Sequence, residues 1–378
     1  MKIELTGAQA ASYAMMQINP DVVSAFPITP QTDIMKEYAL YVRDKKVDTE
    51  FLLMESEHSA LSALVGASSS GARAMTTTSS AGLAYMFEIL GVASGHRLPI
   101  VMNIVNRALS GPINIHCDHS DSMACRDSGW IQLYCENSQE VYDQTLIALR
   151  LAESVSIPAM VMQDGFICSH CFQNMEVLAD KEAKKFIGEY KPKYSLLDFK
   201  KCVTAGPLQL TDYYFETKKQ LSLEMNNVLD SYNKIAKEYE LLSKRKYAPV
   251  EDYKLKDADY VIVALNSVCG LIKDCVDELR DKKIKAGLLK IRAFRPFPYE
   301  LVSKALKNAK RIVVLDRSES LGANAPLFSE IKNSVNNDEL VEGCVYGLGG
   351  RDIFKEHVME LFSNMAKGKK VSRFINSR

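Results

Sequence analysis

The sequence has no excess of charge of either sign and no long apolar run. Lys and Arg together number 47, as do Asp and Glu, so the 378-residue chain has a formal net charge of zero. Binding to nucleic acid, or to anionic lipid through charge, would require a basic excess. No stretch reaches the roughly 18 consecutive apolar residues of a membrane span, and the segment MKIELTGAQAASYAMM has no uninterrupted apolar core of a signal peptide. We therefore expect a cytoplasmic protein that binds neither nucleic acid nor membrane.

The sequence also lacks the common phosphate-binding and cysteine-rich motifs. Neither G-x-x-x-x-G-K-[ST] nor G-x-G-x-x-G occurs, so no standard nucleotide cradle is predicted. The nine cysteines are odd in number and irregularly spaced, which is typical of reduced thiols in a reducing compartment. The repeated C-x₂-C run that binds iron–sulfur clusters is missing, so any such cluster must lie on another chain.

Two short segments contain possible metal ligands. The segment HCDHSD, residues 116–121, combines three ligand types in one loop, and the segment CSHC, residues 168–171, is a single C-x₂-C. A structural zinc site needs four ligands, usually from two such groups. Neither segment has a second group to complete it, so we predict no metal site on this chain.

The residues that are present indicate two α/β domains. Hydrophobic residues make up 47% of the chain, which is enough for large cores. Up to about residue 165, helical patterns alternate with short apolar strands such as residues 99–105, which show no polar alternation and are therefore expected to be covered on both faces. Repeated β–α–β units predict a mostly parallel sheet. A polar connector with a long helix over residues 220–246 precedes a second α/β unit that begins near Ala258.

Ligands of such sheets bind where loops leave the carboxyl ends of the strands, and three of these loops carry candidate residues. Thr29 lies in a segment fixed by prolines on both sides, suited to a carboxylate or carbonyl. Glu57 falls in the first turn of a helix, where a carboxylate either caps the helix or handles a proton. Arg107 follows an apolar strand and is a natural partner of a small carboxylate, or simply a surface arginine.

These segments together resemble one protein family. The runs AFPITPQT, MESEHSALSALVGASSSGARAMTTTSSAGLAYMFEILG, RLPIVMNIVNRALSGPINIHCDHSDSMACRDSGWIQLYCENSQEVYD and DGFICSH occur in the order and spacing of the alpha chain of pyruvate:ferredoxin oxidoreductase, within the 2-oxoacid:ferredoxin oxidoreductase family. The later runs GPLQLTDYYFE, KIRAFRPFP and VLDRSESLGANAPL resemble the corresponding family segments. The resemblance therefore covers nearly the whole chain.

The resemblance implies the fold and the cofactor. Residues 1–230 would form domain I, the pyrimidine-binding domain of thiamine diphosphate enzymes with a helical connector at its end. Residues 231–378 would form domain II, an α/β domain similar to the transketolase C-terminal domain. The diphosphate-binding domain would lie on the beta chain, so thiamine diphosphate is shared between two chains. That arrangement accounts for the absence here of the G-D-G motif that anchors the diphosphate and Mg²⁺.

The resemblance also implies the roles of individual residues. Glu57 matches the glutamate that contacts N1′ of the aminopyrimidine, with Glu55 as the alternative, while Thr29 and Arg107 match residues that bind the carboxylate and carbonyl of pyruvate. The activity would be reversible conversion of pyruvate and coenzyme A to acetyl-CoA and CO₂. Electrons would pass through [4Fe-4S] clusters on partner chains to ferredoxin, and beta, gamma and delta subunits would complete a heterotetramer.

Three alternatives remain at this stage. A related enzyme could act on a branched-chain or other 2-oxoacid, although the RALSGP and HCDHSD loops are closer to the pyruvate branch. A non-catalytic assembly subunit would share the fold, but the intact set of Thr29, Glu57 and Arg107 argues against it. A metalloenzyme could use His116, Cys117 and His119, and metal content of the purified chain would test that alternative.

Overall fold

Seven strands form the larger main sheet of the computed structural model, which describes residues 1–335 and 337–378. Their order is β12-β6-β7-β5-β4-β2-β3, and all neighbours are parallel except the pair β12 and β6. This arrangement confirms the predicted parallel α/β sheet. The strands are β2 (Val22–Ala25), β3 (Glu50–Leu53), β4 (Ala74–Thr78), β5 (Val101–Asn106), β6 (Ile131–Tyr134), β7 (Ala159–Asp164) and β12 (Ala293–Arg295).

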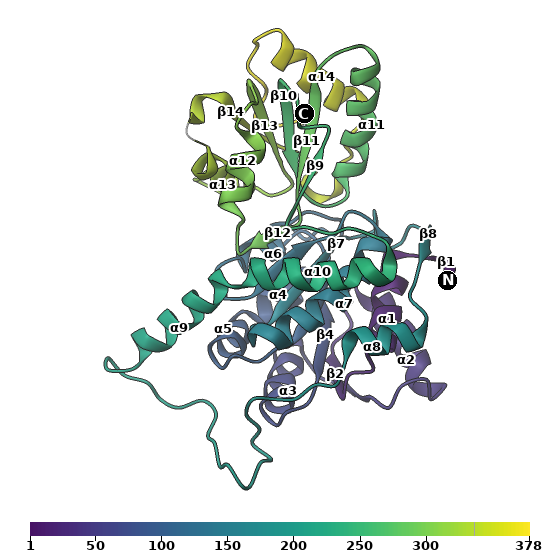
Figure 1. Cartoon of the computed structure of the whole chain (residues 1–378), viewed down its shortest axis with the longest axis vertical. Helices are drawn as coiled ribbons and strands as arrows, with labels where there is room; N and C mark the ends of the chain where they lie inside the picture. Colours follow the sequence, from purple (N-terminus) through teal and green to yellow (C-terminus); the bar gives the residue numbers. More distant parts are fainter. Residues whose placement is uncertain (336) are drawn as a thin grey trace.

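Helices cover both faces of this sheet (Figure 1). Along the fully buried strand β5, Val101 and Val105 face the core beneath α1 and α7, while Met102 and Ile104 face the core beneath α3 and α5. Two buried faces explain the absence of polar alternation in this strand. The helices are α1 (Gly7–Ile18), α2 (Thr32–Arg43), α3 (Glu57–Ser69), α4 (Ser80–Tyr85), α5 (Phe87–Gly95), α6 (Ser120–Ala124), α7 (Ser138–Val155) and α8 (Asp180–Ile187).

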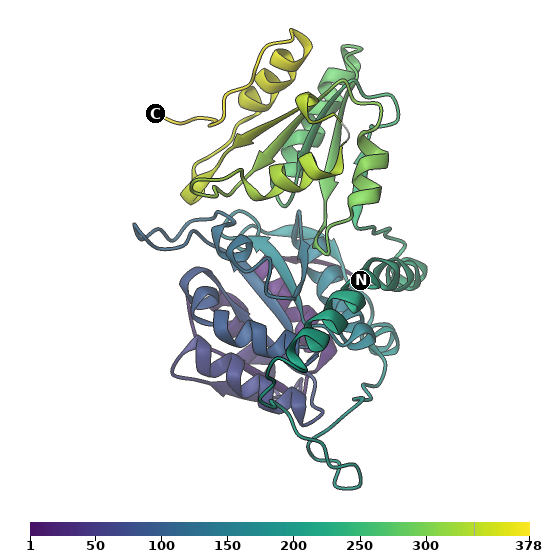
Figure 2. The ribbon, with the colours of Figure 1, turned by 90° about the vertical axis from the view of Figure 1, so that its left-hand side faces the viewer.

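A second, five-stranded sheet has the order β14-β13-β10-β11-β9, in which only β9 is antiparallel to its neighbour. Figure 2 shows this sheet and its helices stacked on the carboxyl-end side of the first sheet. The strands are β9 (Val250–Tyr253), β10 (Tyr260–Ala264), β11 (Ala286–Ile291), β13 (Arg311–Asp316) and β14 (Val341–Val345). The helices are α11 (Val268–Asp281), α12 (Tyr299–Leu306), α13 (Pro326–Ser334) and α14 (Lys355–Ala366), with short 3₁₀ turns η1 (Asp338–Leu340) and η2 (Leu348–Gly350).

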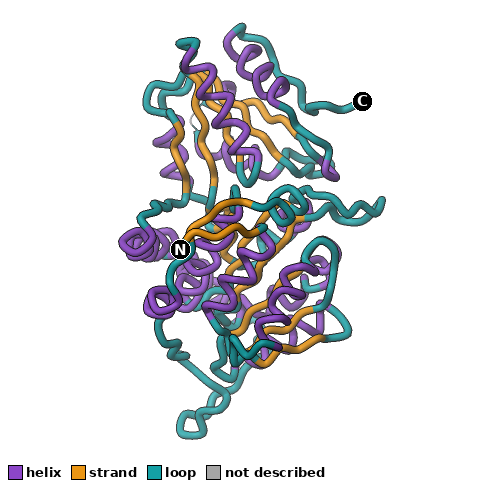
Figure 3. The backbone as a smooth tube through the Cα atoms, turned by 90° about the vertical axis from the view of Figure 1, so that its right-hand side faces the viewer, coloured by secondary structure: helices purple, strands orange, loops and turns teal. Residues whose placement is uncertain are grey.

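The connector contains two helices where the sequence predicted one. α9 (Tyr214–Asn226) and α10 (Val228–Ser243) meet at Asn227. α10 buries Tyr232 and Tyr239 against α7, whereas α9 buries only Leu221 and lies against α5. The two halves of the polar run therefore pack against different helices. Between β4 and β5 the chain also forms two helices, α4 and α5, which meet at Met86. Before α9, an extended loop projects away from the body (Figure 3).

Two further pairings were not predicted from the sequence. β1 (Lys2–Leu5) and β8 (Gln173–Glu176) form a separate antiparallel ribbon. β12 follows β11 of the second sheet in the chain, yet it pairs with β6 at the edge of the first sheet, and so ties the two units together. Within the described residues, no helix is both long and apolar enough to cross a bilayer.

Candidate functional site

The three predicted loops leave the same edge of the first sheet. β2, β3 and β5 are parallel and end at Ala25, Leu53 and Asn106, so the residues that follow them gather at one side. Thr29 and Arg107 are in direct contact, because Arg107 Nη1 donates a hydrogen bond of 2.8 Å to the Thr29 carbonyl. Glu57 makes no hydrogen bond to either of them among the described residues.

Arg107 is buried without a salt bridge in the described part of the chain. Its side chain is only 7% exposed, and Nε donates a second hydrogen bond, of 3.0 Å, to the Asn114 carbonyl. Burial lowers the pKa of the guanidinium because a charge in low dielectric is costly unless it is paired. Nη2 has no hydrogen bond to a described residue. The arginine is thus held in place by two carbonyls and retains donors and charge for an anion.

Glu57 is the first residue of α3, yet it does not cap the helix. The cap is Ser56, whose hydroxyl accepts the Ser59 N–H at 3.2 Å. The Glu57 residue is 7% exposed and its carboxylate has no hydrogen bond or ion pair within residues 1–335 and 337–378. Glu55, the alternative, is exposed and accepts hydrogen bonds from the hydroxyls of Ser56 and Ser59. Of the two glutamates, Glu57 is therefore the one with unused acceptor capacity in a buried setting.

Asp121 organises the site, and the sequence did not single it out. Its carboxylate accepts hydrogen bonds from the N–H groups of Ser80, Arg107 and Ser122 at 3.0, 3.0 and 2.7 Å. A fourth bond, of 2.8 Å, comes from the Asn106 side chain. Burial raises the pKa of Asp121 to about 6. The loops after β4 and β5 are thus joined to α6 through one carboxyl group.

Ser80 connects Asp121 to α4, the helix that lies beside Glu57. It has a left-handed φ of 45°, which is uncommon for a residue with a side chain. Its N–H bonds to Asp121, and its hydroxyl donates a 2.5 Å hydrogen bond to the Ala108 carbonyl. Two residues later, a Cβ on Gly82 would lie 2.6 Å from Glu57 Oε1. The strained turn therefore places α4 directly against the glutamate.

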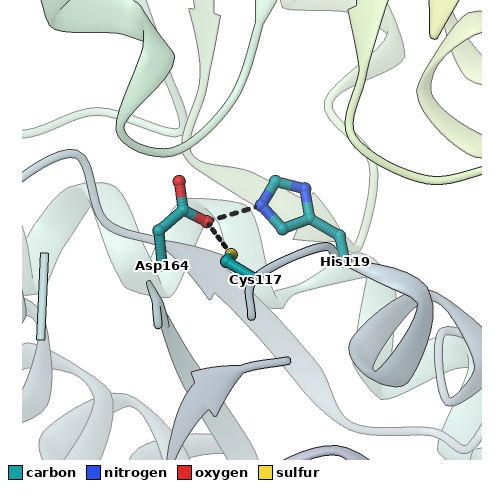
Figure 4. Close-up of side chains that lie close together, drawn as sticks. All are labelled: Cys117, His119 and Asp164. Atoms are coloured by element: carbon teal, nitrogen blue, oxygen red, sulfur yellow. Dashed lines mark hydrogen bonds and ion pairs between the residues drawn. The ribbon is translucent and has the colours of Figure 1, made fainter. Parts of the chain in front are cut away.

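Cys117 and His119 of the 116–121 segment form a buried cluster with Asp164 (Figure 4). Cys117 Sγ donates to Asp164 Oδ1 at 3.2 Å, and His119 Nε2 lies 2.7 Å from the same oxygen. Arg317 Nη1 donates to Oδ2 at 3.2 Å. His116 is not part of this cluster and contacts the ring of Phe166. The set linking Cys117, His119 and Asp164 has metal-ligand spacing, but the arginine already supplies the positive charge, so an ion pair between the two units explains it.

A second buried charge cluster also joins the two units. Glu140 accepts hydrogen bonds from Lys290 Nζ at 2.6 Å and Arg292 Nη2 at 2.8 Å. Glu136 and Glu251 bind the same lysine. Burial by itself would raise the pKa of Glu140, but Arg292 and Lys290 more than offset that effect and lower it. These three glutamates also have metal-ligand spacing, and here too basic side chains occupy the positions between them.

Family comparison covers most of the chain. A family model described as "Pyruvate flavodoxin/ferredoxin oxidoreductase, thiamine diP-bdg" matches residues 13–239. A second, described as "Pyruvate:ferredoxin oxidoreductase core domain II", matches residues 258–358.

Curated relatives align with the chain over almost its full length. The pyruvate synthase subunit PorA of Thermotoga maritima is 53% identical over 98% of this chain and 96% of the relative. The corresponding subunit of Methanocaldococcus jannaschii is 44% identical, covering 97% of this chain and 95% of the relative. The ketoisovalerate oxidoreductase subunit VorA of Pyrococcus abyssi is 38% identical, covering 97% of this chain and 94% of the relative.

Solved structures support the fold. A 2-oxoglutarate:ferredoxin oxidoreductase from Magnetococcus marinus superposes with a TM-score of 0.78 at 20% identity, covering 97% of this chain and 65% of that longer chain. A split-gene transketolase superposes with a TM-score of 0.57 at 12% identity, covering 97% and 99%. Both comparisons agree with the predicted fold of two α/β domains.

Proposed function

The chain belongs to the pyruvate:ferredoxin oxidoreductase family, and on that premise we propose that it is the alpha subunit of such an enzyme and binds pyruvate. The reaction is the oxidative decarboxylation of pyruvate with coenzyme A to acetyl-CoA and CO₂, with electrons passed to ferredoxin, and it is reversible. The observation that carries the proposal is the pair Arg107 and Glu57. Both are buried at one sheet edge, and neither is neutralised by a salt bridge within the described residues.

Arg107 and Thr29 suit a 2-oxoacid. The guanidinium can form two parallel hydrogen bonds to a carboxylate, and its bonds to the carbonyls of Thr29 and Asn114 fix its orientation in advance. The Thr29 hydroxyl lies in the same loop and can donate to the neighbouring carbonyl oxygen. Holding the substrate in one orientation removes translational and rotational freedom before the chemical step.

The surroundings of Glu57 fit the aminopyrimidine of thiamine diphosphate. Among the described residues the carboxylate has an open acceptor and the buried Thr78 hydroxyl has no hydrogen-bond partner, and Gly82 leaves space beside both. When bound, the cofactor supplies the electron sink for loss of CO₂ from a 2-oxoacid. Glu57 would hold a proton at a ring nitrogen of the pyrimidine, a task for which a buried carboxyl group is suited. Burial by the surrounding helices would also keep water from that proton.

The remaining parts of the enzyme belong to other chains in this proposal. The diphosphate-binding domain and its Mg²⁺ would lie on a beta subunit, and the [4Fe-4S] clusters on beta, gamma or delta subunits. The nine cysteines of this chain are free, and seven of them are buried. Free thiols in this number suit the reducing cytoplasm.

The test is an assay of the assembled complex. This chain is co-expressed with its partner chains, and anaerobic, coenzyme A-dependent reduction of a viologen dye by pyruvate is measured for wild type, Glu57→Gln and Arg107→Ala. Activity in the wild type and its loss in both variants support the proposal. A complex that contains its clusters and thiamine diphosphate but turns over no 2-oxoacid would refute it, leaving a role in assembly.

A branched-chain 2-oxoacid is the second candidate substrate. The VorA relative of Pyrococcus abyssi is 38% identical to this chain, and the PorA relative of the same organism is 39% identical, so these two relatives alone do not separate the substrates. The 53% identity to the Thermotoga PorA favours pyruvate. Assays with pyruvate and 2-oxoisovalerate side by side decide: a higher kcat/KM for the branched substrate would move the chain to that branch.

A further inference from the structure

Thr78 has a buried hydroxyl with no partner. It is the last residue of β4 and is fully buried, and among the described residues its Oγ1 has no hydrogen bond. Two positions earlier in the same strand, Thr76 donates a 2.7 Å hydrogen bond to the Ser24 carbonyl. A buried hydroxyl left unpaired costs about 1–3 kcal/mol. Because the unpaired Thr78 hydroxyl lies at the carboxyl end of β4, beside the site, we expect its hydrogen-bond partner to be a group of the site.

Gly82 shows which partner lies within reach. A Cβ at this position would be 2.6 Å from Glu57 Oε1 and 2.6 Å from Thr78 Oγ1, so the two oxygens border the same small space. Gly82 lies inside α4 with an ordinary helical backbone, so glycine is not required there for its conformation. What matters at position 82 is that glycine has no side chain to fill this space. Any other residue would occupy the space that separates the hydroxyl from the carboxylate.

We propose that Thr78 is a positioning residue for Glu57, and that its hydroxyl donates a hydrogen bond to one carboxylate oxygen across the space above Gly82. A rotation of the Glu57 carboxylate closes the gap and leaves the other oxygen free for the ligand. A hydroxyl–carboxylate bond in a dry site is charge-assisted and stronger than a neutral one. A hydroxyl donor favours the ionised form of the carboxylate that it binds over the protonated form. The catalytic meaning of this bond rests on the proposed function, but its existence does not.

The chain offers a matched control in Thr77. This residue precedes Thr78 in β4, is equally buried, and also has an unpaired hydroxyl. Successive side chains of a strand point to opposite faces of the sheet, so the Thr77 hydroxyl is directed away from Glu57. If buried threonines in β4 served only to fill space, replacing either hydroxyl with a methyl group would have the same effect on Glu57.

The first experiment titrates Glu57 in the full-length chain without cofactor. The δ-carbon of Glu57 is followed by ¹³C NMR and assigned with Glu57→Gln, in wild type, Thr78→Val, Thr78→Ser and Thr77→Val. We expect Thr78→Val to raise the titration midpoint by about one pH unit, a tenfold change in proton affinity, while Thr78→Ser and Thr77→Val stay near wild type. If Thr78→Val does not fold, Thr78→Ala is compared with Thr78→Ser. Equal midpoints for the variants with and without the hydroxyl would overturn the proposal.

A second experiment separates this inference from the proposed function. Thiamine diphosphate affinity of the assembled complex is measured for Thr78→Val, Thr77→Val and Gly82→Ala. We expect about tenfold weaker binding for Thr78→Val, wild-type binding for Thr77→Val, and the largest loss for Gly82→Ala, whose Cβ collides with the carboxylate. If the Glu57 midpoint shifts in Thr78→Val but the complex binds no thiamine diphosphate, the Thr78–Glu57 hydrogen bond is supported and the proposed function is rejected. Unchanged binding and an unchanged midpoint in Thr78→Val would reject the bond itself.

Discussion

Arg107 Nη1 donates a 2.8 Å hydrogen bond to the carbonyl of Thr29, 78 residues earlier in the chain. The contact follows from strand order, because β5 and β2 flank β4 in a parallel sheet and their carboxyl ends lie at one edge. Two residues selected separately as carboxylate ligands are therefore parts of one structure, and the guanidinium holds the Thr29 loop in place.

Replacing Arg107 tests both functions of its guanidinium. In Arg107→Ala we expect kcat/KM for pyruvate to fall at least about 100-fold, since hydrogen bonds to charged groups contribute about 1.5–3 kcal/mol each and each 1.4 kcal/mol is a factor of ten. Arg107→Lys should be intermediate, because an ammonium keeps the charge but not the planar fork. Steady-state dye reduction by the complex measures both. Arg126→Ala, at a partly exposed arginine just after α6, serves as the control, and equal losses in the two alanine variants would contradict a specific role.

The variants Glu57→Gln and Glu55→Gln test which of the two glutamates is needed for activity. Glu57→Gln should lower the free energy of unfolding by no more than about 1.5 kcal/mol, because the amide oxygen of glutamine can still accept the hydrogen bond proposed from Thr78. Its activity should fall by about 10²–10⁴-fold, the usual contribution of a proton-transfer group. Glu55→Gln should keep activity, since Glu55 is exposed and bonded to Ser56 and Ser59. Urea unfolding and dye reduction supply the two measurements, and a reversed order of activities would reassign the role to Glu55.

The parts of the fold that the sequence predicted are those with a local signal. The continuous apolar run of β5 and the helix that has Glu57 in its first turn are indicated by neighbouring residues, and both are present in the structure. β12 has only three residues, and its pairing with β6 depends on how two sheets are placed. No periodicity in that segment could reveal it.

The site was predictable to the same extent and for the same reason. Thr29, Glu57 and Arg107 could be proposed because each follows a recognisable strand, and their roles remain predictions. Asp121 and Asp164 were missed because their partners are distant in sequence: Asp121 binds Ser80, 41 residues away, and Asp164 binds Arg317, 153 residues away. The HCDHSD segment gave a signal for a cluster, but the local sequence could not show that an arginine from the other unit completes it.

Lys290 is expected to be essential for the stability of the interface between the two units. It is fully buried and bonded to Glu136 and Glu140 at 2.6 Å each. Lys290→Met would leave buried carboxylates with too few partners, which costs about 3–5 kcal/mol. Urea unfolding followed by the fluorescence of Trp130, the single tryptophan of the chain, measures the loss. Lys282→Met, at an exposed i,i+4 pair, is the control and should change stability by less than about 0.5 kcal/mol.

The same cluster predicts a pH dependence through Glu251. Burial by itself would raise the pKa of Glu251, but Lys290, Lys273 and Arg292 bring it to about 2. The unfolded chain, with a glutamate pKa of about 4.3, binds more protons than the folded one between about pH 4.3 and 2. Stability from this group is therefore complete above about pH 4.3 and is lost as the pH falls through that range. Glu251→Gln should reduce the pH slope of unfolding free energy there by up to one proton, and an unchanged slope would contradict the ion pairing.

Asp164 and Arg317 permit the most stringent test of how the two units are joined. Asp164 is fully buried at the end of β7 and receives a 3.2 Å hydrogen bond from Arg317, which follows β13 of the second sheet. Removing either partner alone leaves an unpaired buried charge, so Asp164→Asn and Arg317→Met should each cost about 3–5 kcal/mol. Removing both leaves no buried charge at this position. The double variant should then lose less than the sum of the single losses, with a coupling energy of about 1–3 kcal/mol in a double-mutant cycle of urea unfolding. Additive losses would show instead that Asp164 acts through His119, Cys117 and Asn266, whose bonds to it remain when the arginine is gone.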